Sequence, residues 1–498
     1  MPQARTRKGG ILALTCLVQL MVVLDVAIVN VALPSIQREL GLARGTLQWL
    51  VISYTLMLGG FLLLGGRMAD LIGRRRVLMS GLVLFSGASL AAGLGKSAGM
   101  IIAARGVQGF GAALMAPAAL SILAVTFADG AGRNRALGIF GAVGGTSASI
   151  GVITSGLLTD GPGWRWVFFI NVPVGIVLLA LAATLLATDQ PRARGRRFDA
   201  VGAAAATAGL LALVYALNRG AGNGWASAST LSLFAGAAVL LGLFVALEAR
   251  AAEPLVPANV VRSRTVLAAN SMAFFVFGSV FPFIFLGSLL MQQVLGYSPT
   301  KTGVSWLATS LTAFAVAGVT GARLATTIGV GKLLLTGMAL LAISAGWLWR
   351  VPADASYAAD LLPAFLLTGI AIGLCAVSVQ IAALSGVASH ASGVASGLVE
   401  TMREIGGAVG VAAVSTVLIS RTPKAGEVAT PAALQSTLLD GFHAAYLVIF
   451  VLAALGGILA TVAYVRHRPA VPGPDAHTAA LLETSATEAV VDHSRTDP

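Results

Sequence analysis

The chain has 498 residues, of which 57% are hydrophobic and only 10% are charged. Soluble domains usually carry about 25% charged residues, so this composition argues against an ordinary soluble protein and predicts an all-α polytopic membrane protein. The formal net charge of +12 does not indicate a nucleic-acid-binding face, because the basic residues lie in short loops between apolar segments.

Fourteen apolar segments are candidates to cross a hydrocarbon core of about 30 Å as helices. They cover residues 11–33, 47–66, 77–95, 100–126, 137–158, 166–187, 201–217, 230–247, 266–290, 302–325, 333–348, 361–384, 392–419 and 446–465. Lysine and arginine fall mainly on the side of the two termini, which predicts an even number of spans with both termini cytoplasmic. Arg5, Arg7 and Lys8 precede a first apolar run without a convincing cleavage site, so we expect an uncleaved first helix.

These spans divide into two sets of six with two extra spans between them. We therefore expect a cytoplasmic amino-terminal segment (1–10), a first six-helix half (11–187), a linker with two extra helices (188–264), a second six-helix half (265–465) and a disordered cytoplasmic tail (466–498).

The first span carries Asp25 near its middle. A carboxylate within the bilayer costs on the order of 3 kcal/mol, so it normally faces the bundle interior or a wet cavity. Burial favours the neutral acid, which makes proton uptake near neutral pH feasible. The alternative is a structural Asp25 that is satisfied by Asn30 or by a neighbouring helix.

The segment 65–76 is a short basic connection between the second and third spans. Its arginines predict a cytoplasmic position, and we expect Gly65, Gly66 and Gly73 to permit a sharp turn. Asp70 could bond a neighbouring helix end or Arg67. The alternative is a basic hairpin without a special role.

The same segment resembles the G-x-x-x-D-x-x-G-R-[RK] loop signature of the major facilitator superfamily. Gly66, Asp70, Gly73, Arg74 and Arg75 stand at the signature positions. In that superfamily the loop also joins the second and third spans, so the resemblance implies two pseudo-symmetric six-helix halves and a conformational role for these residues.

The fourth span contains Arg105, which shares a helical face with Gln108 and Gly109. A buried arginine needs acceptors, so a structural ion pair is the alternative to a transport role. The segment resembles the R-x-x-Q-G motif of the superfamily, and this resemblance implies that Arg105 takes part in proton coupling with Asp25. Gln108 and Asn30 are candidates for substrate binding.

The fifth span carries small residues in two sets at four-residue spacing, Gly141 with Gly145 and Ser147 with Gly151 and Ser155. Close helix packing explains this pattern. Drug/proton antiporters usually carry a G-P…G-G signature at this place. Gly151 and Gly156 match it and are expected to act in conformational change, whereas Val152 replaces the proline and Ser155 replaces a glycine, which predicts an altered hinge.

The sixth span begins with the pattern W-R-W-x-F-x-x-N-x-P at residues 164–173. Together with the Asp25 helix and fourteen spans, this pattern resembles the fourteen-span drug/proton antiporter family over about residues 11–465. The resemblance implies an exporter similar to actinobacterial antibiotic and multidrug exporters.

The second half contains a weak repeat of the basic loop at residues 321–329. It keeps Arg323 and Gly329 but has Thr326 in place of Asp70. Repeats of this kind give transporters two halves that rock around a site near the middle of the membrane.

The thirteenth span holds Glu400, Arg403 and Glu404. The two glutamates are one helical turn apart and are candidates for substrate binding, because a cationic compound could replace a proton on either of them. The alternative is an internally neutralised cluster in which Arg403 is a structural ion-pair partner. Its spacing makes Glu400 the expected partner, whereas Glu404 should point about 100° away from Arg403.

The sequence therefore predicts a proton-coupled exporter of amphipathic, cationic drugs or antibiotics that works by alternating access. We expect no enzymatic activity, no cofactor, no metal and no nucleic-acid partner; the expected partners are the substrate, protons and membrane lipid, with a monomer as the working unit. The two cysteines lie in apolar runs, and no ATP-binding pattern is visible. The alternatives are a uniporter or importer of the same fold, and a membrane receptor or scaffold.

Overall fold

The computed structural model describes residues 2–42, 44–127, 130–189, 199–251, 254–257, 260, 262–421 and 431–465, and these ranges contain no strand. The first half consists of α1 (Pro2–Leu40), α2 (Arg44–Leu71), α3 (Arg74–Gly93), α4 (Ala98–Thr126), α5 (Ala131–Asp160), α6 (Trp166–Phe169) and α7 (Asn171–Leu185). The two extra helices are α8 (Ala200–Asn223) and α9 (Ala228–Glu248).

The second half begins at α11 (Arg264–Leu289). It continues with η1 (Leu290–Val294), α12 (Pro299–Ser305), α13 (Leu307–Val319), η2 (Thr320–Leu324), α14 (Ala325–Thr327), α15 (Val330–Leu348), η3 (Tyr357–Leu361), α16 (Leu362–Leu384), η4 (Ser389–Ala391), α17 (Ser392–Arg421), α18 (Pro431–Ala460) and η5 (Thr461–Val465).

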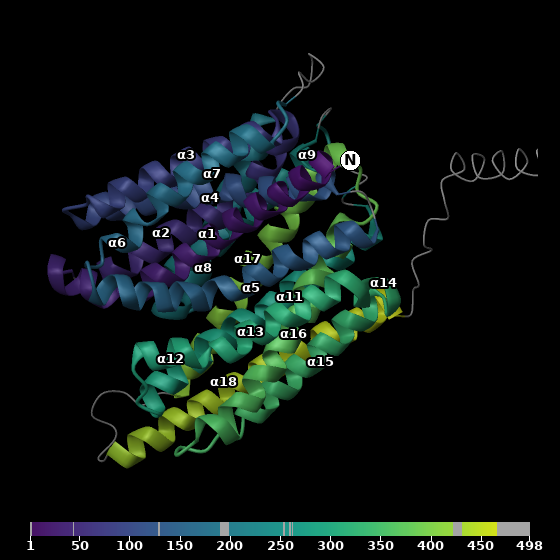
Figure 1. The fold of residues 1–498 in the computed structure, drawn as a ribbon. Helices are drawn as coiled ribbons and strands as arrows, with labels where there is room; N and C mark the ends of the chain where they lie inside the picture. The colour runs from purple at the N-terminus through teal and green to yellow at the C-terminus, as the bar shows by residue number, and fades with distance from the viewer. Residues whose placement is uncertain are drawn as a thin grey trace, which may run out of the picture.

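The helices form two groups that pack against each other along their length. Figure 1 shows the purple-to-blue helices of the first half above α12, α13, α15 and α18, with α5 and α11 near the boundary. The contacts between the halves are chiefly those of α2 with α17 and of α5 with α13. A single hydrophobic cluster includes residues of both halves, among them Val22, Phe140, Val276 and Val399. The predicted all-α architecture with two halves is therefore confirmed.

Thirteen helices of the described part are long and apolar enough to cross a membrane. The remaining predicted span corresponds to α5, a helix of 30 residues that is not among these thirteen. The structure is consistent with fourteen spans. The division at 187, 264 and 465 stays a prediction, and the expected disordered tail, 466–498, lies outside the described residues.

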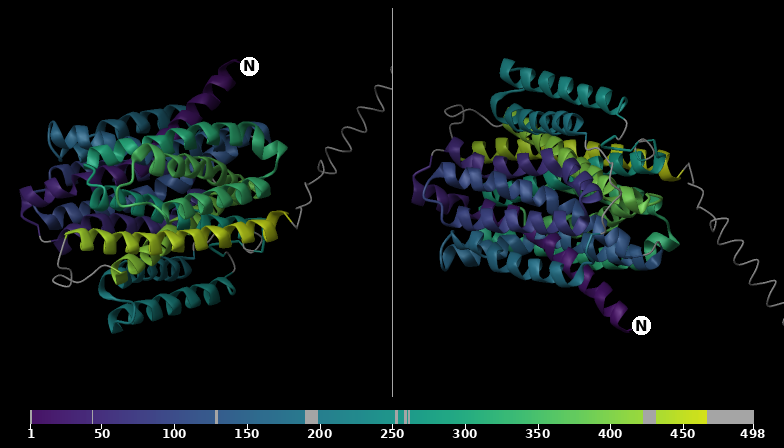
Figure 2. Two further views of the ribbon diagram at one scale, coloured as in Figure 1. Left: turned by 90° about the horizontal axis from the view of Figure 1, so that it is seen from below. Right: turned by 90° about the horizontal axis from the view of Figure 1, so that it is seen from above.

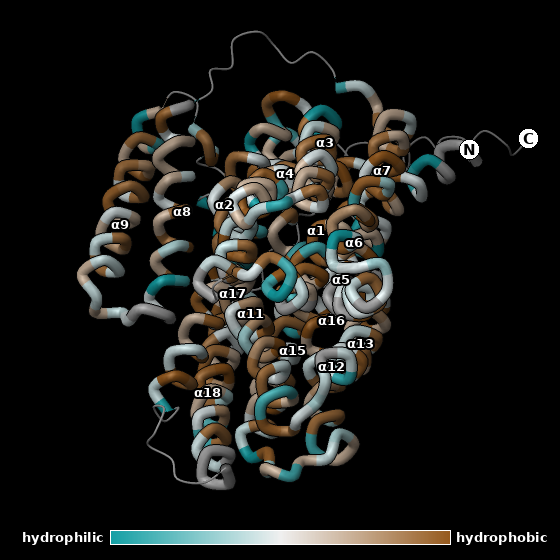
Figure 3. Tube along the Cα trace, turned by 90° about the vertical axis from the view of Figure 1, so that its left-hand side faces the viewer, coloured by the Kyte–Doolittle hydropathy of each residue, from teal (hydrophilic) through white to brown (hydrophobic). Residues whose placement is uncertain are grey.

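The α8–α9 pair lies beside both halves rather than beside one of them. It projects from one side of the bundle in Figure 2, and Figure 3 shows α8 next to α2 and α17. On α2, Trp49 packs against Tyr215 with a ring-centroid distance of 5.7 Å. On α17, Thr416 Oγ1 accepts a hydrogen bond of 2.7 Å from Trp225 Nε1. The extra helices thus bridge the boundary between the halves.

The outward faces of the helices are apolar, as a hydrocarbon environment requires. Brown, hydrophobic residues cover much of α9 and α18 in Figure 3. On α9, Val239 and Val245 keep 69% and 64% of their surface exposed. These exposed valines are expected to contact lipid.

The expectation that Gly65 and Gly66 form a turn is wrong. The helix α2 continues to Leu71, so both glycines are helical and only Gly73, with φ of 119°, turns the chain. A Cβ at Gly65 would collide with the carbonyl oxygen of Ala113 on α4. The glycines therefore serve close helix packing, a use that local spacing does not distinguish from a turn.

The weak sequence repeat has a structural counterpart. Gly73 directly precedes α3, and Gly329, with φ of 89°, directly precedes α15. A positive φ is readily accessible only to glycine, which explains why these two positions of the repeat carry it.

Candidate functional site

Asp25 of α1 and Arg105 of α4 form an ion pair inside the first half, with 0% and 1% of their surfaces exposed. Arg105 Nη1 contacts Asp25 Oδ2. Arg105 Nε also donates to the carbonyl oxygen of Leu50, at 3.0 Å, and its guanidinium lies 4.2 Å from the ring centroid of Tyr54. These contacts compensate the desolvated charge of the arginine.

Further hydrogen bonds hold the other oxygen of the Asp25 carboxylate. Asp25 Oδ1 accepts from Asn171 Nδ2 at 2.9 Å and from Gln108 Nε2 at 3.3 Å. Gln108 Oε1 accepts from Arg105 at 3.1 Å, and Gln108 Nε2 donates to Ser89 Oγ at 2.6 Å. This network gives both oxygens of the Asp25 carboxylate protein partners. Protonation would remove its attraction for Arg105 and leave the arginine without its counter-charge.

Glycines bring the helices of this network close enough for the contacts to form. A Cβ at Gly109 would collide with the backbone of Tyr54, so this glycine lets α4 approach α2 next to Arg105. A Cβ at Gly151 would lie 2.8 Å from Ala27 Cβ, so Gly151 brings α5 against α1 beside Asp25. The two glycines thus set the positions of the helices that carry the ion pair.

A second set of contacts joins the halves at the end of the bundle that carries Arg74, called here the Arg74 end. Asp70 of α2 accepts backbone hydrogen bonds from Gly393, at 3.0 Å, and from Val394, at 2.8 Å, in the first turn of α17. A helix N-terminus presents free N–H groups and a partial positive charge, so a carboxylate stabilises it. Asp70 therefore bonds a neighbouring helix end, one of the two partners expected for it.

Arg74 strengthens this connection. Its Nη2 lies 3.3 Å from Asp70 Oδ1 and 3.0 Å from Ser392 Oγ, and its Nε donates to Ser121 Oγ at 2.7 Å. A Cβ at Gly66 would collide with the Gly393 carbonyl, so the two helices touch through glycine. We call Asp70, Arg74 and the first turn of α17 the latch.

Arg75 and Gly73 act within the first half instead of at the latch. The backbone N–H groups of Arg75 and Arg76 donate to the Asp189 carboxylate at 3.3 and 2.9 Å, so Asp189 caps α3. The Arg75 side chain donates to the carbonyl of Ala183 at 2.8 Å. A Cβ at Gly73 would collide with Asp189. These residues fix the position from which Arg74 reaches α17.

The remaining glycine of the predicted hinge, Gly156, has looser surroundings. A Cβ on it would lie 4.0 Å from Thr300 Oγ1 of α12, which is ordinary contact across the boundary. Ser155 beside it donates to the Ile28 carbonyl at 2.6 Å. The serine that replaces the expected glycine thus bonds α5 to α1.

The three ionisable residues of α17 form one cluster. Arg403 Nη1 lies 2.6 Å from Glu400 Oε2, and Arg403 Nη2 lies 3.0 Å from Glu404 Oε1. The side chains of Glu400, Arg403 and Glu404 are 3%, 13% and 18% exposed. The expectation that Glu404 points away from Arg403 is wrong, because these long side chains bend toward each other despite the angle between their Cα positions. With both glutamates ionised, the cluster carries one net negative charge.

Tyr54 connects the two charge clusters. Its ring packs on Arg105 of the first half, and its hydroxyl donates to the Val22 carbonyl at 3.2 Å. It is also close enough to interact electrostatically with Arg403 and Glu404 of the second half.

The end of the first half opposite the Arg74 end is tied by the W-R-W segment. Trp164 Nε1 donates to Glu39 Oε2 at 2.7 Å, and Arg165 pairs with Glu39 and donates to the Gly95 carbonyl at 3.3 Å. The hydrogen bonds from Arg165 and from Trp164 hold the pKa of the Glu39 carboxyl below its usual value. This part of the sixth-span pattern connects α1, α3 and α6.

Comparison with known proteins decides the family. The sequence profile of the Major Facilitator Superfamily matches residues 15–411. The chain belongs to this superfamily. It is 37% identical over 454 residues to the cephamycin export protein CmcT of Amycolatopsis lactamdurans, a match that covers 91% of this chain and 92% of that protein. It is 38% identical over 417 residues to the puromycin resistance protein pur8 of Streptomyces alboniger, covering 81% and 80% of the two chains.

The multidrug resistance protein Stp of Mycobacterium tuberculosis (strain H37Rv) is 34% identical over 398 residues, with 80% of this chain and 73% of that protein covered. Solved structures share the superfamily fold at low identity. The human organic anion transporter MFSD10 superposes with a TM-score of 0.66 at 15% identity, covering 91% of this chain and 99% of that chain. The chain is thus a multi-pass transporter of the cell membrane for small molecules, not an enzyme, and its relatives are named for cephamycin export, puromycin resistance and multidrug resistance.

The superfamily motifs identify helices that carry the ion-pair network, but they do not identify every residue that bonds Asp25. Asn171 bonds Asp25 directly, yet the sequence marks it only as part of the sixth-span pattern; its polar amide within an apolar helix is the available signal. Asn30 is exposed and makes no described bond to Asp25. Gln108 lies inside the ion-pair network, where its amide already has protein partners, so its use as a substrate ligand is not supported.

Metal binding finds no support in the described part of the chain, where no three His, Cys, Asp or Glu side chains are grouped as ligands would be.

Proposed function

We propose that this member of the superfamily exports amphipathic, largely cationic, drugs or antibiotics in exchange for protons. The observation that carries the proposal is the Asp25–Arg105 pair, which is buried within the first half, in a chain whose two halves are linked by the latch. The relatives named for export of cephamycin and for resistance to puromycin support efflux as the direction of transport.

The proposed cycle uses the charge of Asp25 as its switch. In the ionised state Asp25 neutralises Arg105 and holds α1, α4 and α7 together. When a proton neutralises Asp25, Arg105 loses its counter-charge while it stays buried against the Tyr54 ring. Because a buried charge without a partner is costly, this state favours a rearrangement between the halves.

The negative cluster of α17 supplies the preference for cations. Glu404 is the more exposed of its two acids, and a cationic compound near it competes with Arg403. The latch opens and closes the Arg74 end, which the positive-inside rule assigns to the cytoplasm together with both termini. Each monomer contains both halves and so a complete pathway.

A direct test compares drug accumulation in cells that lack their own exporters. Cells with the wild-type chain should accumulate less puromycin than cells with an empty vector, and a protonophore should abolish the difference. Asp25→Asn should behave as the empty vector at an equal amount of protein in the membrane. Export that persists in the presence of the protonophore would refute proton coupling, and higher accumulation would indicate an importer.

Orientation needs a separate experiment. Alkaline phosphatase fused after Arg468 should be inactive, because it would remain in the cytoplasm. An active fusion would contradict both the orientation of the carboxyl terminus and the count of fourteen spans.

A further inference from the structure

Two glutamine side chains are buried with an unused hydrogen-bonding group. Gln19 of α1 is 2% exposed and Gln380 of α16 is 9% exposed. The Oε1 atom of each has no hydrogen-bond partner within the described residues. Buried polar atoms are nearly always paired, and an unpaired one costs about 1–3 kcal/mol. Each side chain therefore has a free acceptor to which the described part of the chain supplies no donor.

The two glutamines come from different halves but face the same helix. A Cβ at Gly144 of α5 would lie 3.5 Å from Gln19 Nε2, and a Cβ at Gly141 would lie 3.6 Å from Gln380 Oε1. Residues three apart on a helix share a face and are separated by about 4.5 Å along its axis. Both amides thus lie within about one turn of α5, and each faces a glycine that places no side chain against it.

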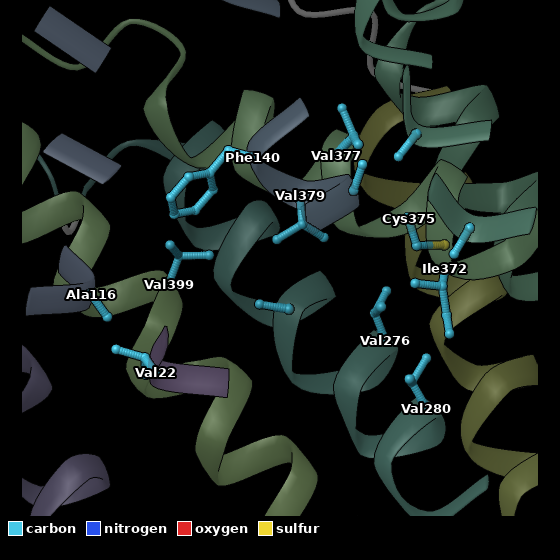
Figure 4. Packing of buried hydrophobic residues seen from close by; sticks show 14 of the residues in the cluster. Val22, Ala116, Phe140, Val276, Val280, Ile372, Cys375, Val377, Val379 and Val399 are labelled. Atoms are coloured by element: carbon cyan, nitrogen blue, oxygen red, sulfur yellow. The ribbon is translucent and has the colours of Figure 1, made fainter. Parts of the chain in front are cut away.

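Apolar residues lie close to both glutamines. Val22 lies one turn beyond Gln19, Phe140 adjoins Gly141, and Val377 Cγ2 would lie 3.3 Å from a Cβ at Gly141. Figure 4 shows Val22, Phe140, Val377 and Val399 in one packed cluster drawn from both halves. A few polar groups among apolar walls are the usual composition of a site for a small organic molecule.

We propose that Gln19 and Gln380 together bind the uncharged O–H and N–H groups of the exported compound and so set its specificity. This proposal rests on the export function proposed above. The ligand class is an amphipathic organic molecule with hydroxyl or amide N–H donors, which satisfy the two free oxygens. Since each half supplies one amide, both can bind the same compound only when the halves stand in this relative arrangement.

Gln108 provides the contrast that distinguishes a ligand from a structural glutamine. Its Oε1 accepts from Arg105, and its Nε2 donates to Asp25 and Ser89, so its amide is engaged by protein partners. Replacing Gln108 should impair folding or every transport reaction. Replacing Gln19 or Gln380 removes no hydrogen bond of the amide oxygen and should affect only compounds that donate to it.

The test measures dissociation constants with purified protein in lipid nanodiscs. Gln19→Met and Gln380→Met keep the side-chain length but remove the amide. Gln37→Met is the control, because Gln37 lies near the end of α1 and its amide already donates to the Leu42 carbonyl at 3.2 Å. The probes are tetraphenylphosphonium, which has no O–H or N–H group, and three compounds that have both, namely puromycin, lincomycin and chloramphenicol. We expect Kd to rise about 5- to 10-fold for the donor-bearing compounds in each variant, since a hydrogen bond contributes about 1 kcal/mol or slightly more.

The same variants should bind tetraphenylphosphonium within twofold of the wild type and keep its melting temperature. Equal weakening for both kinds of probe, unchanged binding of the donor-bearing compounds, or a wild type that binds none of the three would each overturn the proposal. A melting temperature lowered in both variants would show that the glutamines are structural. The binding assay uses no proton gradient, so its failure is distinguishable from a failure of proton-coupled export.

Discussion

The latch offers the sharpest test of how the halves are connected. In the described structure the Asp70 carboxylate accepts two backbone hydrogen bonds from the first turn of α17 and pairs with Arg74. Asp70→Ala removes these three interactions at once. The two hydrogen bonds exist only while the Arg74 end is closed, because they join a helix of one half to a helix of the other.

The size of the effect follows from the hydrogen bonds that the substitution removes. Replacing a capping aspartate by alanine costs about 0.5–2 kcal/mol, and a hydrogen bond to a charged group makes a net contribution of about 1.5–3 kcal/mol. We therefore expect Asp70→Ala to destabilise the closed state by about 1–2 kcal/mol, which lowers the ratio of closed to open molecules about 5- to 30-fold.

The assay is a distance measurement between spin labels at Ile72, after α2, and Ala388, before α17, in a chain without its two native cysteines. Asp70→Ala should enrich the longer distance. Asp199→Ala is the matched control, because Asp199 caps α8 through the Gly202 N–H, at 2.8 Å, within a single chain segment; it should leave the distances unchanged. A wild-type distance distribution in Asp70→Ala would refute the latch.

Three further predictions concern other parts of the molecule. Hydrogen bonds lower the pKa of Glu39 in the folded state. The stability that they contribute is therefore present above pH 4.5, the ordinary pKa, and is lost as the pH falls through the lowered pKa. Tryptophan fluorescence should show this transition, and Glu39→Gln should remove it. Glu404→Gln should reduce resistance to cationic compounds more than to neutral ones, whereas Glu400→Gln should lower the protein level; equal loss for both compound classes in Glu404→Gln would assign that residue to coupling or folding. Trp225→Phe deletes the hydrogen bond to Thr416, worth about 1 kcal/mol, and should lower the melting temperature; an unchanged value would show that the α8–α9 pair is held by apolar packing alone.

Sequence patterns predict those features that are expressed within one helix. The spans follow from apolar runs, and an isolated aspartate and arginine within two of them identify Asp25 and Arg105 because charges in a membrane need partners. Their joint role follows from the superfamily resemblance, and the described structure shows the two side chains as an ion pair.

Features that depend on contacts between two helices are harder to predict from the sequence. Asn171 as a partner of Asp25, and Leu50 as an acceptor for Arg105, come from helices distant in sequence, and no local spacing relates them. The turn expected at Gly66 is wrong because a glycine can permit either a turn or close helix packing, and the sequence does not show which of the two applies. The orientation of Glu404 depends on side-chain bending, which Cα geometry does not describe.

Proton coupling through Asp25 is tested most directly in liposomes that contain the purified protein and a pH-sensitive dye. A puromycin gradient should drive proton movement in the opposite direction with the wild type. Asp25→Asn should bind puromycin but move no protons, because an amide does not take up and release a proton under the conditions of the assay. Proton movement at the wild-type rate in Asp25→Asn would contradict the assignment of Asp25 as the proton carrier.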